Sequence, residues 1–189
     1  MKTSLWVLFL LPATTLVAGV ELKSRQETIL LFENRRLTIA LPDGFECVPG
    51  KDESGMITLK LADQKEKVSG EVKFLPDPEG RFTNARARKD LMNEMFFDYV
   101  GSSSEKAMQF EELDPRVGAG TYCVFTDSSL VGKTPLPSGE FLHLTAGLKA
   151  WPGVVAVFRF FSNDTASAEY QAVLKLLRES VQEKPAPLK

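Results

Sequence analysis

The chain has 189 residues, a formal net charge of −2, one His and two Cys. Its content of 43% hydrophobic and 25% charged residues is ordinary for a globular protein and excludes an intrinsically disordered chain. The isoelectric point of about 5.6 excludes the basic excess of a typical nucleic-acid-binding domain. One His and two Cys are too few for a zinc site of the usual Cys/His type, and we expect no cofactor.

Residues 1–19 predict a cleaved secretory signal peptide. Lys2 supplies a positive charge, an apolar run from Leu5 to Leu11 follows, and the small residues Val17 and Gly19 suit a cleavage site. The run is shorter than the roughly 20 apolar residues that span a membrane, although a retained N-terminal anchor is the alternative. We therefore predict an exported protein, periplasmic or secreted, with a single domain over 20–183 and a disordered tail over 184–189.

The first half of the mature chain predicts short strands followed by a helix. The strands are expected within 28–41, over 45–48 and 56–61, and from residue 72 onward, with Pro-Asp-Gly and Pro-Gly turns between them. A helix is expected over 84–100, with Asn84 as its N-cap. Its apolar stripe consists of Leu91, Met92, Met95, Phe96 and Tyr99.

The second half predicts four strands, over 108–113, 120–126, 141–151 and 154–161, and then a second helix capped by Asp164 or Ser167. A Pro-Gly turn places Trp151 opposite Val154, and we expect a bulge or a loosened closure there. In that register large apolar side chains occupy both faces of the hairpin, so other parts of the protein must cover each face. The order of elements predicts an α+β fold, with a mainly antiparallel sheet and helices packed on both faces.

Several segments resemble the PsbP-like α/β sandwich superfamily, which includes DcrB-like proteins of the bacterial envelope. The segments are Leu41-Pro42-Asp43-Gly44-Phe45, Gly118-Ala119-Gly120-Thr121-Tyr122, Leu148-Lys149-Ala150-Trp151-Pro152-Gly153, Glu169-Tyr170-Gln171-Ala172-Val173-Leu174 and Glu179-Ser180-Val181. The resemblance implies an α/β/α sandwich and a non-enzymatic accessory or binding protein, and it carries over no catalytic residue.

The two cysteines, Cys47 and Cys123, fall in predicted strands. Export would place them in an oxidising compartment, where two thiols often form one disulfide. A disulfide between Cys47 and Cys123 and two separate buried thiols are both compatible with the sequence.

A basic cluster surrounds the start of the first predicted helix. Its members are Arg81, Arg86, Arg88 and Lys89. Cations are unfavourable at a helix N-terminus, because that end carries partial positive charge. The cluster is either a solvated basic surface or a binding patch for an anionic group or an acidic partner.

Three functions follow as hypotheses. The absence of a catalytic motif favours a non-catalytic envelope domain that binds a protein partner, rather than an enzyme. A small-molecule carrier is the alternative, with an apolar pocket lined by Phe158, Phe160 or Phe96. A secreted hydrolase would have to use His143, which lies in a predicted strand and is more simply a structural imidazole.

Overall fold

A computed structural model describes residues 22–114 and 119–183. The predicted signal peptide over 1–19 and the predicted tail over 184–189 lie outside the described residues. No helix of the described part is both long and apolar enough to cross a membrane.

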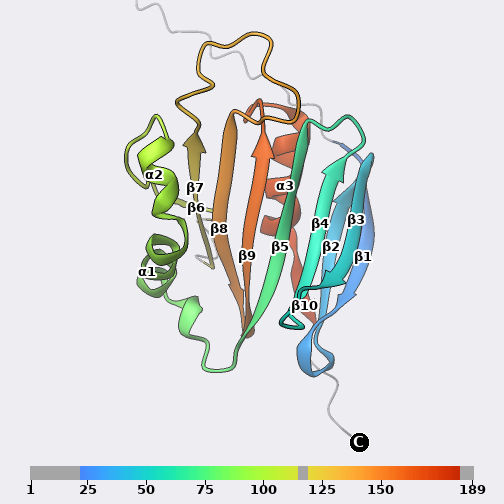
Figure 1. Ribbon diagram of the computed structural model, residues 1–189. Coiled ribbons are helices and arrows are strands. Elements are labelled where there is room, and N and C mark those ends of the chain that lie inside the picture. The colour runs from blue at the N-terminus through green and yellow to red at the C-terminus, as the bar shows by residue number, and fades with distance from the viewer. Residues whose placement is uncertain (1–21, 115–118, 184–189) are drawn as a thin grey trace, which may run out of the picture.

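A seven-stranded sheet forms the centre of the fold, in the order β3-β4-β5-β9-β8-β7-β6 (Figure 1). All neighbouring strands are antiparallel, which confirms the prediction of a mainly antiparallel sheet. The strands are β3 (Phe45–Lys51), β4 (Ile57–Asp63), β5 (Val68–Asp77), β6 (Glu111–Glu112), β7 (Gly120–Thr126), β8 (His143–Trp151) and β9 (Gly153–Ser162).

A second, three-stranded sheet joins the two ends of the described chain. It has the order β1-β2-β10, and its strands are β1 (Ser24–Leu30), β2 (Arg36–Pro42) and β10 (Val181–Glu183). A short 3₁₀ turn, η1 (Phe32–Asn34), connects β1 to β2. The sequence did not predict β10, which pairs with β2 from Thr38 to Arg36.

The three α-helices are α1 (Ala85–Phe96), α2 (Asp98–Ser102) and α3 (Ala168–Glu179), and the 3₁₀ turn η2 (Arg81–Thr83) precedes α1. Asn84 caps α1 as predicted, since its side chain accepts from the amides of Arg86 and Ala87. The predicted helix 84–100 is divided near Phe97, whose carbonyl accepts from the amide of Val100 in a tighter turn. Ser167, one of the two predicted caps, accepts from the amide of Tyr170 at the start of α3.

The β8–β9 hairpin has the predicted register. Trp151 lies opposite Val154, and Leu148 lies opposite Val157. The register continues without interruption to His143 and Ser162, so the expected bulge or loosened closure is wrong. Gly153 has a φ of 80°, which the Pro-Gly turn requires.

Alternate residues of β9 enter two separate hydrophobic clusters. One cluster combines β9 residues such as Phe158 with strand β2 and with α3, and the other combines Val155 and Val157 with Met92 and Phe96 of α1. In Figure 1, α3 passes behind the sheet, while α1 and α2 lie beside β6 and β7. The apolar side chains of the hairpin are therefore divided between these two clusters, whereas Val48 on β3 and Lys60 on β4 are exposed.

Candidate functional site

The surface formed by β3, β4 and β5 alternates between buried and exposed side chains. Leu59 and Leu61 on β4 are 1% and 2% exposed, whereas Lys60 between them is exposed. Val48, which pairs with Lys60 from the edge strand β3, is 57% exposed. Antiparallel sheets commonly leave one face in water in this way. We call this surface of β3, β4 and β5, with Lys60 near its centre, the open face.

Two cross-strand rows of side chains run over the open face toward α2. The first row is Val48, Lys60, Glu71 and Arg159; the second is Glu46, Ala62, Ser69, Phe161, Leu144 and Phe125. The first row is mostly charged, while the second becomes aromatic and aliphatic as it approaches β7. The surface therefore changes from polar to apolar across the sheet.

A hollow of about 490 Å³, the charged groove, lies over the polar half. Its walls include Glu46, Val48, Lys60, Glu71 and Arg159. Arg159 forms an ion pair with Glu71. The carboxylate of Glu71 and the hydroxyl of Tyr99 bond to this guanidinium and raise the pKa of Arg159 above its ordinary value.

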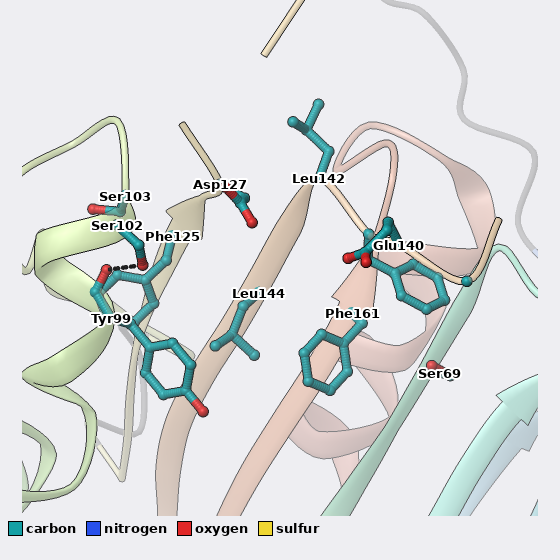
Figure 2. Close-up of a pocket in the computed structure, with 12 residues that line it drawn as sticks. Ser69, Tyr99, Ser102, Ser103, Phe125, Asp127, Glu140, Leu142, Leu144 and Phe161 are labelled. Carbon is teal, nitrogen blue, oxygen red and sulfur yellow. Dashed lines mark hydrogen bonds between the residues drawn. The ribbon is translucent and has the colours of Figure 1, made fainter. Parts of the chain in front are cut away.

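A second hollow, the aromatic pocket, has a volume of about 450 Å³ and adjoins the charged groove at Ser69 and Phe161. Its walls include Tyr99, Phe125, Phe141, Phe161, Asp127 and Glu140. Figure 2 shows Tyr99 and Phe125 on one side, Phe161 on the other and Leu144 on the floor between them.

The loop between β7 and β8 brings two carboxylates to the rim of the aromatic pocket. The backbone N–H of Asp127 donates to the carbonyl of Leu142 at 2.8 Å, which closes the base of this loop. Asp127 and Glu140 therefore lie at the two ends of one closed loop. In Figure 2 their carboxylates turn toward the space above Leu144. The Ser129 hydroxyl and amide bond to Asp127 and lower the pKa of its carboxyl group.

The predicted basic cluster is divided by the fold. Arg81 and Arg86 are exposed, and Lys89 lies over the ring of Phe110, but Arg88 is 0% exposed. Arg88 donates to the Thr121 hydroxyl at 3.0 Å and to the carbonyls of η2, and it ion-pairs with Glu112. The inclusion of Arg88 in a binding patch is therefore wrong, and the hypothesis of an anion-binding surface rests on the other three residues.

Of the two alternatives that the sequence left open for Cys47 and Cys123, the structure has two separate thiols and excludes the disulfide. Both thiols are free. Cys47 is on β3 and Cys123 on β7, with four strands between them in the sheet. At about 4.8 Å per strand their Cα atoms are roughly 24 Å apart, far beyond the 7 Å limit for a disulfide.

His143 lies at the start of β8, next to a hydroxyl and a carboxylate. Its Nδ1 is 3.1 Å from the Thr126 hydroxyl, and that hydroxyl donates to Glu105 at 2.7 Å. Burial lowers the pKa of the imidazole. In a hydrolase triad the carboxylate binds the imidazole, whereas here it binds the hydroxyl. The three groups tie β7 and β8 to the segment after α2 and do not form that triad.

The aromatic residues predicted for a carrier pocket are part of the core. Phe158 and Phe160 are both 0% exposed, and their stacked rings have centroids 5.5 Å apart. Phe96 is 2% exposed. A cleft of about 490 Å³ lies elsewhere, between α3 and β2, with walls that include Ala40, Pro42, Ala172 and Leu176. The role of the three Phe residues as pocket walls is therefore wrong, although a cavity beside α3 exists.

The sequence matches no protein-family model, no curated protein and no solved structure. Within 22–114 and 119–183, no group of three or more His, Cys, Asp or Glu residues could hold a metal ion.

The sequence interpretation missed the two hollows, although part of their signal was present. The hairpin register placed Leu144 and Phe161 on one face, and the loop that precedes the hairpin begins with Asp127 and ends with Glu140. The sequence did not indicate that β5 pairs with β9. This pairing brings Ser69 beside Phe161 and Glu71 beside Arg159.

Proposed function

We propose that this chain is an exported, non-catalytic accessory domain of the cell envelope, and that it binds a protein partner through the open face. The observation that carries the proposal is the exposed surface itself. The charged groove and the aromatic pocket meet at Phe161. Together they form one continuous surface that offers charged, hydrogen-bonding and apolar contacts. Interfaces between proteins combine these contacts in the same way, with an apolar centre and a polar rim.

The architecture proposed with this function is an α/β/α sandwich of the PsbP-like kind, with helices on both faces of the main sheet. The division of β9 side chains between a cluster with α1 and a cluster with α3 supports it. In this arrangement α1 and α2 leave β3, β4 and β5 uncovered, which provides the open face. The predicted signal peptide supports a periplasmic or secreted location.

The experiment compares two tryptophan variants of the mature protein. Ala62→Trp places an indole on β4 within the charged groove, and Ala107→Trp places the same group at an exposed position between α2 and β6, outside the two hollows and the cleft beside α3. Crosslinking and pull-down from the native envelope should recover a partner with the wild type and with Ala107→Trp. Recovery with Ala62→Trp should fall at least tenfold, while its circular dichroism spectrum stays unchanged.

Equal recovery with both variants would contradict binding at the open face. Loss of the partner in the double variant Arg86→Glu/Lys89→Glu, with Ala62→Trp still active, would assign binding to the basic surface beside α1 instead.

The cleft between α3 and β2 favours a small-molecule carrier as the second candidate. Its apolar walls and volume of about 490 Å³ fall in the range of ligand sites. Native mass spectrometry of the purified protein should then show a bound apolar molecule, and Ala172→Trp, which fills the cleft, should remove it. A protein free of bound molecules would contradict this candidate and leave the open-face proposal intact.

A further inference from the structure

We propose that the aromatic pocket binds a small organic cation, an alkylated or quaternary ammonium group. The pocket has aromatic walls, carboxylates at its rim and a volume of about 450 Å³. This binding goes beyond the proposed partner interaction and does not depend on it, since the walls and the rim of the pocket are formed by this chain alone.

The aromatic walls consist of two tilted pairs of rings. Tyr99 and Phe125 have ring centroids 5.9 Å apart at an interplanar angle of 38°, and Phe141 and Phe161 are 5.9 Å apart at 39°. Aromatic faces attract cations through their negative quadrupole, and quaternary ammonium groups are commonly bound between several rings. Rings tilted in this way form corners, so a rounded ammonium group can contact more than one face at once.

The charge of the pocket selects a cation rather than a neutral apolar molecule. Of the described side chains that line the pocket, Asp127 and Glu140 are acidic and none is basic. The hydrogen bonds from Ser129 lower the pKa of Asp127, so its carboxylate is ionised at neutral pH. The guanidinium of Arg159 bonds to the hydroxyl of Tyr99 at the edge of the pocket, but its charge is compensated by the ion pair with Glu71.

The pocket has an apolar floor and a polar rim. The apolar floor contains Leu144, which is 8% exposed, and the Phe125 ring beside it on the wall is 3% exposed. The rim is polar and open to solvent through the exposed Glu140. A ligand with methylated nitrogen would place its methyl groups on the floor and its charge below the carboxylates. We therefore expect trimethylammonium compounds to bind more tightly than a bare ammonium ion.

The test uses choline and its uncharged isostere 3,3-dimethylbutan-1-ol, which differ in charge and hardly in shape. Both are titrated into the mature protein and followed by ¹H–¹⁵N chemical shifts. Choline should bind at least tenfold more tightly than the alcohol. Its affinity should fall about threefold or more in Asp127→Asn and Glu140→Gln, and about tenfold in Phe161→Leu.

Glu46→Gln is the matched control, because it removes a carboxylate from the charged groove without touching the aromatic pocket. It should bind choline like the wild type. Equal affinity for choline and the alcohol would overturn the proposal, as would choline binding that Phe161→Leu and Asp127→Asn leave unchanged. Binding of a trimethyllysine peptide without any binding of choline would also overturn it, in favour of a partner side chain as the occupant.

Discussion

The ammonium group of Lys149 lies 2.9 Å from the carbonyl oxygen of Arg178, so a side chain of the central sheet closes the end of α3. The same ammonium group donates to the carbonyls of Leu177 and Ser180. The last carbonyls of a helix have no partner within the helix. Lys149 supplies one from a side chain that is only 7% exposed.

Replacement of Lys149 by Met should lower the free energy of unfolding by about 2–4 kcal/mol, because buried carbonyl groups lose their donor. Lys175→Met is the matched control on α3. Its side chain is 42% exposed and forms a surface ion pair with Glu179, so the loss should stay below about 1 kcal/mol. Urea unfolding measures both values. Equal losses would show that Lys149 does not cap the helix.

The same lysine should make stability depend on pH. Burial lowers the pKa of Lys149 from 10.5 to about 8 in the folded state. Between these values the unfolded chain binds more protons than the folded chain, so stability increases as the pH rises from about 8 to about 10.5. The difference between wild type and Lys149→Met in urea unfolding isolates this increase. A difference that stays constant across the window contradicts the lowered pKa.

Arg88 and Arg86 should differ sharply although they lie two residues apart. Arg88→Met removes the donors to Thr121 and to the carbonyls of η2, and we expect a loss of about 2–4 kcal/mol. Arg86 is exposed, and Arg86→Met should change stability by less than about 0.5 kcal/mol. Thermal unfolding distinguishes the two, and a stable Arg88→Met protein would contradict the structural role.

The two thiols should remain independent and react at different rates. Burial is the main cause that raises the pKa of Cys123 to about 12, and Cys123 is 0% exposed. Cys47 is only half-buried, so iodoacetamide should modify it many times faster in the folded protein. Mass spectrometry of the alkylated peptides measures the ratio. An intramolecular disulfide in the purified protein would contradict the strand order.

Gly147 should tolerate no side chain. A Cβ atom there would lie 2.5 Å from the ring of Phe158 and 2.6 Å from the carbonyl oxygen of Thr121. Gly147→Ala should therefore cost about 3 kcal/mol. Gly101, near the end of α2, has nothing within 4 Å of that position, and Gly101→Ala should be neutral or slightly stabilising. Chemical unfolding of both variants checks the contrast.

Local signals were sufficient for much of the fold. The β8–β9 register followed from a Pro-Gly turn and from apolar alternation, and the start of α1 followed from Asn84. Both depend on residues close together in the chain. By contrast, the start of β1 gave no such signal. It consists of the polar residues Ser24 and Arg25, and as part of an edge strand these residues pair only with β2 and need no apolar pattern.

Other features depend on contacts between distant segments. Val181 gives β10 a single apolar residue, and its pairing partner Thr38 lies 143 residues earlier. Nothing local could indicate the pairing of β5 with β9, on which both hollows depend. Arg88 was different, because its spacing of four from Met92 and of eight from Phe96 put it on the buried side of α1. That signal was present, but the positive charge favoured an exposed position.

The strands of the three-stranded sheet are also synthesised far apart in time. Its strands β1 and β2 leave the ribosome before the other described strands, whereas β10 leaves after them. Until residues 181–183 are available, one edge of β2 stays without its partner, and an unpaired edge is a template for association with other chains. A chain shortened by these few residues would therefore lose little of its core, yet it would expose the strand on which the ends of the domain meet.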